Sequence, residues 1–488
     1  MGREEQITNE RLRKIKELRD QKINPYPHKF DKKNSCEDCL KSKIGAKVKT
    51  AGRLTSKRDL GNISFAHLQD SSGKIQLVLQ KGETPENATK FFKRYIDSGD
   101  FIGVEGDIFK TKTKEISILV KKVELLSKAI LPLPEKWHGL KDKEERYRKR
   151  YLDLIMDSEV KKVFEKRSKI IDNIKNYLKS KGFLEVEIPT LQTVYGGASA
   201  TPFTTHLNSL NIDLFLSISP ELYLKRLLIG GYEKVFTIGK NFRNEGIDWA
   251  HNAEFTMLEF YYAYANYEEL MKMTEDLINQ LKKELKLKDE LEYQGKKIRL
   301  KTPFKRIKFR DLILEKTKID IEKASDFKTL KQEIEKRKIK EIEINNCKHY
   351  SALLDELYKR VVRPSIIQPT FLTHYPVEMI ALAKRNEKNP RYINSVQLLI
   401  NGAEIVKAYD ELNDPQDQEK RLKEQALLLK KGDSEAMPMD DDFITALKYG
   451  MPPTAGYGLG IDRLIMFLTN QPSIRDVILF PFMKPEKK

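Results

Sequence analysis

The chain has 488 residues, of which 40% are hydrophobic and 33% are charged. A chain longer than about 300 residues excludes a single undivided core, so we expect at least two domains. Lysine and arginine number 90 against 72 acidic residues; the formal net charge of +18 suits a polyanionic partner such as RNA or DNA, although a lysine-rich solubilising surface gives the same balance.

No stretch approaches about 18 consecutive apolar residues, so we expect no membrane partner. Residues 1–21 mix acidic and basic side chains and resemble neither a signal peptide nor a transit peptide. The cysteines are Cys36, Cys39 and Cys347, one close pair and a distant third, whereas a closed zinc site usually needs four ligands. These features predict a cytoplasmic protein.

The first predicted element is a charged helix over residues 5–22, which Asn24-Pro25 ends. From residue 47 the pattern changes to alternating strands separated by turn signals. We expect these strands at residues 48–54, 63–68, 75–79, 101–108 and 116–125. Five strands with a helical segment near 88–98 predict an OB-type barrel, whose exposed face binds single-stranded nucleic acid. We assign residues 1–46 to an N-terminal helical segment and 47–130 to this barrel.

A linker is expected at residues 131–155, beginning with Leu131-Pro132-Leu133-Pro134. Its densely charged part, residues 141–151, favours a solvated helix, with RNA contact as the alternative. Beyond it, helical spacing predicts a long helix over 160–178 that Gly182 ends, and a second amphipathic helix over 270–281. Residues 156–488 are therefore assigned to a mixed α+β domain.

The most informative segment runs from Phe242 to Tyr261. Side chains two apart in a strand share a face, so Phe255, Met257, Glu259 and Tyr261 point the same way. They form a platform with a stacking ring at one end and a carboxylate and a phenol at the other. Because Arg243 precedes this platform and can reach a phosphate, a nucleotide and a small cationic molecule could lie there end to end.

A glycine-rich stretch, residues 456–460, precedes a predicted helix over 461–468 that carries Arg463. A helix start beside an arginine can bind an anion. A tight packing turn is the alternative, because G-x-G-x-G alone is weak evidence. The sequence has no G-x-x-x-x-G-K-[ST] phosphate loop.

Three segments, residues 181–189, 242–259 and 458–463, resemble the three signature motifs of class II aminoacyl-tRNA synthetases. Residues 196–203, 220–223 and 408–415 point further, to the lysyl-tRNA synthetases of that class. The likeness extends over about residues 24–485. It implies an α+β protein with an N-terminal OB-fold β-barrel for the anticodon and a class II catalytic domain, an antiparallel sheet flanked by helices. It also implies a homodimer through the first motif.

The resemblance further implies ATP and Mg²⁺ as cofactors, and L-lysine and tRNA(Lys) as substrates. Lysine would be activated to lysyl-adenylate and transferred to the 3′ end of the tRNA. The implied ATP-binding residues are Arg243, Glu245, His251, Asn252, Phe255, Glu404 and Arg463, with Arg243 and Arg463 catalytic. The implied lysine-binding residues are Gly197, Glu221, Glu259, Tyr261, Lys407, Tyr409, Glu411 and Gly458. The implied anticodon-binding residues are Arg58, Phe65, Gln76 and Glu115.

The implied metal ligand is Glu404, with Gln397 offering only a carbonyl oxygen, where relatives carry a second glutamate. Lys407 stands where relatives carry asparagine, and Thr201 and Leu207 replace an arginine and a histidine. Strict alternation puts Glu404 and Lys407 on opposite faces of a strand, so a bulge must re-aim Glu404 if it binds metal.

Lys407 is hypothesised to form a salt bridge with the substrate carboxylate or a phosphate. The alternative is that it reaches the acidic residues and competes with lysine.

Two other functions stay open at this point. A sibling synthetase for aspartate or asparagine would share the domains, but its site needs cationic or amide groups where this chain has Glu259 and Glu411. A catalytically altered paralogue, acting as an RNA-binding or regulatory protein or using a modified lysine, is suggested by Gln397 and Lys407.

Overall fold

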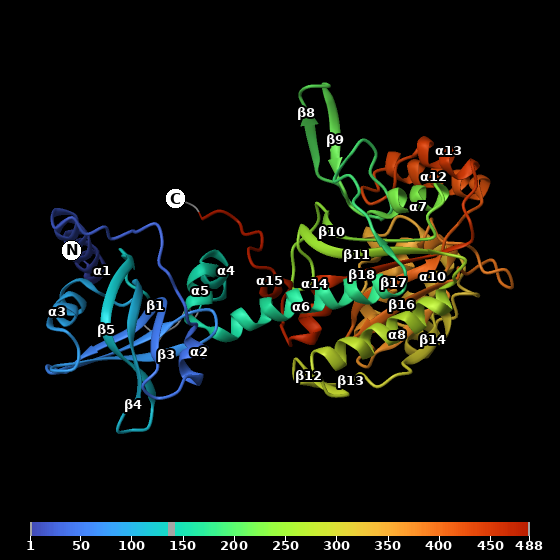
Figure 1. Cartoon of the computed structure of the whole chain (residues 1–488). Helices are drawn as coiled ribbons and strands as arrows, with labels where there is room; N and C mark the ends of the chain where they lie inside the picture. The colour runs from blue at the N-terminus through green and yellow to red at the C-terminus, as the bar shows by residue number, and fades with distance from the viewer. Residues whose placement is uncertain (1, 135–141, 487–488) are drawn as a thin grey trace. The chain divides into compact units, whose positions relative to one another are not determined.

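The computed structural model describes residues 2–134 and 142–486, and the chain divides into two units, Met1–Lys141 and Asp142–Lys488 (Figure 1). Residues 135–141 of the predicted linker lie outside the described residues. Within the part that the structure describes, no helix is both long and apolar enough to span a membrane.

The first unit is built on a closed five-stranded barrel. In spatial order its strands are β1 (Lys47–Asp59), β2 (Ile63–Gln69), β3 (Lys74–Gln80), β5 (Ile116–Ser127) and β4 (Phe101–Lys110). Every second residue of β2 is buried, as expected of strands whose inner faces fill a barrel. With helix α3 (Glu86–Tyr95) between β3 and β4, this arrangement confirms the predicted OB-type barrel.

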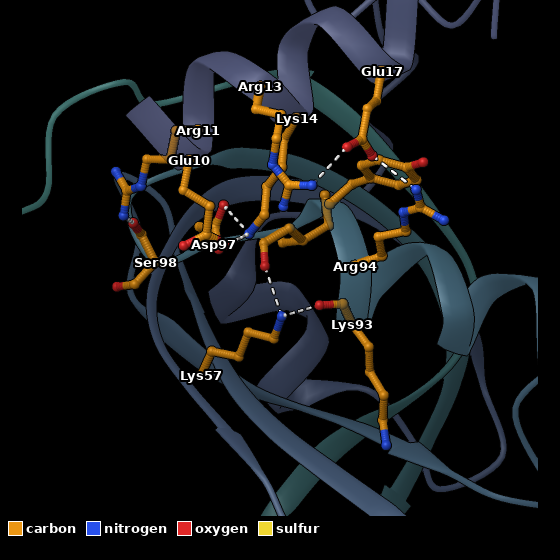
Figure 2. A network of polar contacts seen from close by, with 12 residues as sticks. Glu10, Arg11, Arg13, Lys14, Glu17, Lys57, Lys93, Arg94, Asp97 and Ser98 are labelled. Atoms are coloured by element: carbon orange, nitrogen blue, oxygen red, sulfur yellow. Dashed lines mark hydrogen bonds and ion pairs between the residues drawn. The ribbon is translucent and has the colours of Figure 1, made fainter. Parts of the chain in front are cut away.

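Helix α1 (Arg3–Asp20) is charged, yet polar contacts hold one of its faces to the barrel (Figure 2). The buried Arg11 guanidinium donates to the carbonyls of Ser98, Ala129 and Leu131. Lys14 Nζ lies 2.8 Å from Asp97 Oδ1. Some of the charged side chains of this helix therefore have a structural role, because they hold it against the barrel.

Helix α2 (Cys36–Lys41) covers the barrel with two buried thiols, Cys36 and Cys39. Burial raises the pKa of the Cys36 thiol to about 12, so it stays neutral. Across the described residues no cluster of three or more His, Cys, Asp or Glu could hold a metal ion.

The second unit contains an eight-stranded sheet. In spatial order its strands are β14 (Lys305–Lys308), β15 (Thr370–Thr373), β16 (Ser395–Ile400), β17 (Ala403–Asp410), β18 (Thr454–Gly460), β11 (Glu254–Ala263), β10 (Lys234–Phe242) and β6 (Leu184–Glu185). Neighbours run antiparallel except for the parallel pairs β14–β15 and β10–β6. This is the predicted antiparallel sheet with parallel strands at its edges.

Helices cover both faces of this sheet (Figure 1). One face packs on α6 (Ser158–Ser180), α8 (Tyr267–Glu284) and α14 (Ile461–Leu468). The other packs on α7 (Glu221–Ile229), α9 (Phe309–Thr317), α10 (Phe327–Lys336), α11 (Tyr350–Leu357), α12 (Pro415–Lys430) and α13 (Asp441–Lys448). Alternation along β11 divides its side chains accordingly, with Phe260 in the first core and Tyr261 in the second.

The smaller elements lie around this sheet. They are α4 (Lys143–Arg148), α5 (Arg150–Met156), β7 (Leu191–Gln192), β8 (Thr204–Leu207), β9 (Ile212–Leu216), β12 (Glu290–Tyr293), β13 (Lys296–Arg299) and α15 (Ile474–Val477). The solvated helix expected over 141–151 is instead the packed pair α4–α5. Arg150 is only 1% exposed, and its guanidinium donates to the Arg475 and Leu479 carbonyls and pairs with Asp153. Asp153 compensates its charge, and the C-terminal segment supplies the carbonyl acceptors, which sequence spacing does not reveal.

Candidate functional site

A cavity of about 810 Å³ opens on the sheet face that α7 and α11 flank. The residues predicted for ATP, lysine or metal that line it are Gly197, Glu221, Arg243, Glu245, His251, Asn252, Phe255, Glu259, Tyr261, Gln397, Glu404, Lys407, Tyr409, Gly458 and Arg463. Glu411 is the exception and lies behind the lining. The platform predicted along β11 is the floor of this cavity.

Strand register shows how β18 leaves the floor open. Gly458 pairs with Glu259 on one side and Lys407 on the other, and Gly456 pairs likewise with Tyr261 and Tyr409. A Cβ on Gly456 would lie 1.8 Å from Glu411 Oε1, so no side chain fits there. The stretch 456–460 is thus a strand with glycines on the cavity side rather than a tight packing turn, and it leads directly into the predicted helix over 461–468, α14, which carries Arg463.

Three carboxylates, Glu221, Glu259 and Glu411, form what we call the acidic end of the site. They are 4%, 5% and 1% exposed. Ser219 Oγ and the Tyr261 hydroxyl donate to Glu259 over 2.8 and 3.0 Å, and the Tyr409 hydroxyl donates to Glu221 over 2.7 Å. Burial next to these acids raises the pKa of both phenols well above the usual range, so both remain hydrogen-bond donors.

Lys225, on α7, is a member of this cluster that sequence analysis missed. Its fully buried Nζ lies 2.6 Å from Glu221 Oε1 and forms an ion pair with Glu411. Glu411 Oε1 has no hydrogen-bond partner among the described residues. Since one lysine faces three carboxylates, the acidic end has two uncompensated negative charges when fully ionised. The missed signal was the spacing of four between Glu221 and Lys225, which pairs them on one helix face.

The acidic end therefore retains protons. Burial, together with the neighbouring charge of Glu221, raises the pKa of Glu259 to about 8. Burial likewise raises the pKa of Glu411 well above the usual range, although Lys225 opposes this shift. A bound cation would allow these carboxyls to ionise, which makes the pocket selective for positively charged groups.

Arg243, Glu404 and Arg463 form the second part of the site, which we call the phosphate end. The Arg243 guanidinium carbon lies 5.0 Å from the centre of the Phe255 ring. Arg243 Nε and Asn252 Oδ1 are buried without a hydrogen-bond partner among the described residues. Unsatisfied buried polar atoms are rare, and here they border the cavity where a ligand could complete them.

Arg463 projects from the first turn of α14. Its guanidinium donates to the Glu404 carbonyl over 3.2 Å and to the Ala250 carbonyl over 3.4 Å. Burial lowers its pKa, and the charges of Arg243 and Arg363 lower it further. Arg363, which sequence analysis did not single out, also lines the cavity. Three guanidinium groups close enough to repel one another suit a polyanionic ligand such as a triphosphate.

His251 and Glu245 lie on the exposed loop between β10 and β11. His251 Nδ1 is 2.9 Å from Asp248, whose carboxylate also accepts hydrogen bonds from the backbone amides of Ala250 and His251. The histidine therefore braces the loop, and the side chains of His251 and Glu245 also line the cavity.

The bulge that Glu404 requires is present. Leu398 pairs with Val406 and Leu399 with Glu404, so Ile405 is the extra residue of β17. It turns the Glu404 side chain to the same face as Lys407, and both line the cavity.

Gln397, opposite Lys407, is buried, and its Oε1 accepts hydrogen bonds from the Tyr358 and Tyr375 hydroxyls. That oxygen is already engaged within the protein.

Gly197 has a backbone φ of +85°, and a Cβ there would lie 2.8 Å from Ser219 Oγ. This position beside Glu221 therefore requires glycine. Neither of the replacements Thr201 and Leu207 lines the cavity. The Thr201 carbonyl accepts a hydrogen bond from the Asn244 amide, and Leu207 ends strand β8.

The predicted anticodon residues gather on one face of the barrel. Arg58 pairs in register with Phe65, and Gln76 Nε2 donates to Glu115 over 2.9 Å. A smaller cavity, about 410 Å³, is lined by Gln76, Glu115 and His67, among others. His67, which pairs in register with Gln76, was not predicted, although it lies two residues after Phe65 on the same strand.

Comparison with known proteins agrees with this geometry. The family described as class II tRNA synthetases (D, K and N) matches residues 142–484, and the OB-fold nucleic acid binding domain matches residues 48–126. The second unit is thus a class II synthetase domain.

Three lysine–tRNA ligases illustrate the similarity. That of Pelotomaculum thermopropionicum is 47% identical over the whole of this chain and 97% of its own length. Those of Thermotoga maritima and Carboxydothermus hydrogenoformans are 46% and 47% identical, covering 99% and 98% of this chain and 97% and 98% of their own lengths. The chain belongs to the lysine–tRNA ligase family of the class II tRNA synthetases. These similarities do not favour the aspartate, asparagine or altered-paralogue alternatives.

Proposed function

We propose that this protein activates L-lysine with ATP to lysyl-adenylate and transfers the lysyl group to the 3′ end of tRNA(Lys). The observation that carries the proposal is the charge of the acidic end. Three buried carboxylates face one internal lysine, and the two remaining charges match the two ammonium groups of lysine. Aspartate and asparagine each carry one ammonium and would leave a buried carboxylate unpaired.

The two ends of the cavity assign roles to its residues. Glu221, beside Gly197, faces the α-ammonium, and Glu259, with Tyr261 and Tyr409, faces the side-chain ammonium. Glu411 forms an ion pair with Lys225 and affects the substrate only through that lysine. At the phosphate end Arg243 and Arg463 bind the triphosphate, Phe255 stacks on the adenine, and Asn252 borders the nucleotide.

The reaction then needs positioning more than acid–base catalysis. A lysine carboxylate oxygen attacks the α-phosphorus; a new P–O bond forms, and the bond to pyrophosphate breaks. Arg243 and Arg463 stabilise the charge that develops on the phosphates. Mg²⁺, when bound, would add Lewis-acid stabilisation of the same charge, with Glu404 as one carboxylate ligand and the remaining ligands supplied from outside the protein. A ribose hydroxyl of the tRNA then attacks the lysyl carbonyl, and AMP leaves.

The OB barrel would bind the anticodon through Phe65, Gln76, Arg58 and Glu115, by stacking and by hydrogen bonds to base edges. We also propose a homodimer, supported by the exposed Leu184 and Leu191 in the segment that resembles the first motif. Because ATP and tRNA are its substrates, the protein would act in the cytoplasm. Light scattering on the purified protein would test the dimer.

An ATP–pyrophosphate exchange assay with each amino acid in turn tests the activity. We expect exchange with lysine alone. Exchange with aspartate or asparagine would support the sibling synthetases, and exchange with no amino acid would support the altered paralogue. Charging of tRNA(Lys) by the same preparation tests the second step.

A further inference from the structure

Lys407 is an unpaired cation that lines the cavity between its two ends. It lies on β17 between Glu404 of the phosphate end and Tyr409 of the acidic end. Among the described residues its ammonium has neither a hydrogen-bond nor an ion-pair partner. A cation placed where the two ends meet faces the position at which the substrate carboxylate and the α-phosphate must approach each other.

The register also limits where this ammonium can reach. Gly458 lies between Lys407 and Glu259, so two strand spacings, about 10 Å in all, separate their backbones. The structure shows no ion pair between the two side chains, both of which it describes. The alternative in which Lys407 neutralises the acidic end is therefore not what the structure contains.

The residues around Lys407 do not suit a divalent cation held by the protein. Of the two positions that the resemblance implies for a metal ion, Glu404 offers a carboxylate, whereas the Gln397 oxygen is occupied by two tyrosine hydroxyls. Lys407 itself lies directly opposite Gln397 and would repel a metal ion there. Of Glu404 and Gln397, only Glu404 therefore remains as a ligand for magnesium, at the low end of the one or two carboxylates that proteins usually supply.

We propose that the Lys407 ammonium replaces a protein-bound divalent cation at the junction of the two ends and binds the oxyanion there. The shared chemistry is an oxyanion, supplied by the α-phosphate of ATP or by the carboxylate of lysine. This inference rests on the proposed function and deepens it. The Lys407 ammonium then supplies part of the stabilisation of the oxyanion charge, so nucleotide binding depends less on magnesium.

Binding measurements on the full-length protein test this inference, with EDTA present and one substrate at a time. In the ATP arm or the lysine arm, Lys407→Asn should weaken binding by about tenfold or more, because a charge-assisted hydrogen bond is lost. The arm that changes identifies the oxyanion. Lys407→Arg should bind as the wild type does, which separates loss of charge from misfolding.

Lys348→Asn is the matched control. It removes one positive charge from an exposed residue of the same cavity and should change either affinity by less than about threefold. A second readout is the number of Mn²⁺ ions bound with ATP, counted by electron paramagnetic resonance. The double variant Gln397→Glu/Lys407→Asn, two charge units more negative, should bind one more Mn²⁺ than the wild type.

Unchanged affinity in both arms for Lys407→Asn would overturn the inference, and so would equal Mn²⁺ counts in the wild type and the double variant. Failure of the proposed function has a different signature. In that case the wild type shows no lysine-dependent pyrophosphate exchange at saturating Mg²⁺, whatever the binding arms report.

Discussion

Lys225 links the carboxylates of the acidic end into one electrostatic unit. It pairs with Glu221 on its own helix and with Glu411 after the end of β17, and all three side chains are buried. Removing one partner of a buried ion pair leaves the other charge uncompensated, which is more costly than losing an exposed pair. A change at Glu411 should therefore be felt at Glu221 even though Glu411 does not line the cavity.

We expect Glu411→Gln to raise the KM for lysine by about tenfold or more, because the amide cannot balance Lys225. The dissociation constant for ATP should not change, since Glu411 is remote from the phosphate end. Pyrophosphate exchange against lysine concentration and calorimetry with ATP measure the two effects. Glu378→Gln, at an exposed residue lining the same cavity, is the control. An unaltered KM would show that Glu411 is assigned wrongly.

The affinity for lysine should depend on pH through Glu259. In the empty protein its pKa is about 8, so at pH 7 the carboxyl is mostly protonated. Binding of an ammonium favours the ionised form, and a proton leaves. Affinity should therefore rise with pH, by at most about tenfold per unit for a single group, and level off above about pH 8.

Calorimetry in two buffers with different ionisation enthalpies measures the protons released. At pH 7 we expect net release on lysine binding. Glu259→Gln, which has no proton to lose there, should show less release along with weaker binding. An affinity that stays constant between pH 6.5 and 8 would contradict this linkage.

At the scale of elements, strand β18 is the part of the sheet that makes room for a substrate. Its residues Gly456 and Gly458 each lie between a paired residue of β11 and a paired residue of β17. The two positions differ in the space available. A Cβ on Gly456 would collide with Glu411 and Tyr261, whereas one on Gly458 would meet its nearest atoms at 3.7 and 3.8 Å.

Gly456→Ala should accordingly destabilise the protein by about 1–3 kcal/mol, the usual cost of overpacking, and abolish measurable lysine binding. Gly458→Ala is the matched control: it should leave the melting temperature almost unchanged and reduce lysine affinity only by filling part of the cavity floor. Thermal unfolding and lysine titration of both variants provide the comparison. Equal losses at the two positions would contradict the register of β18 between β11 and β17.

How far the sequence predicted these elements depends on the range of the interactions involved. The period-two pattern was sufficient to put Phe255, Glu259 and Tyr261 on one face, because alternation is a local property of strands. The bulge at Ile405 was required by the chemistry of Glu404 and is observed. A packing turn stayed open as the alternative for residues 456–460, because a turn and a strand with one uncovered face can have the same glycine-rich composition.

Two features of the acidic end depend on tertiary packing. Glu411 lies beyond the last residue of β17 and behind the cavity lining, where it forms an ion pair with Lys225 from another element. From its spacing alone, Lys225 would be expected to form an ordinary exposed ion pair with a residue of its own helix. Its burial arises only when α7 packs on the sheet, which is a tertiary event.

At the scale of the whole molecule, the two units divide the proposed reaction. The cavity that would activate lysine is lined entirely by residues of the second unit, while the barrel face with Phe65, Gln76 and Glu115 belongs to the first. Changes on the barrel should therefore affect the tRNA step and leave the ATP step intact. The excess of basic residues should make the tRNA step weaker at higher salt.

Phe65→Ala tests this division. Loss of one base-stacking ring is worth about 1–3 kcal/mol, so the KM for tRNA(Lys) should rise by roughly tenfold, with lysine-dependent pyrophosphate exchange unchanged. Tyr449→Ala, which removes an 85% exposed ring of the second unit, is the control and should alter neither step. If Phe65→Ala reduced exchange as much as charging, or left charging untouched, the barrel face would not be the anticodon site.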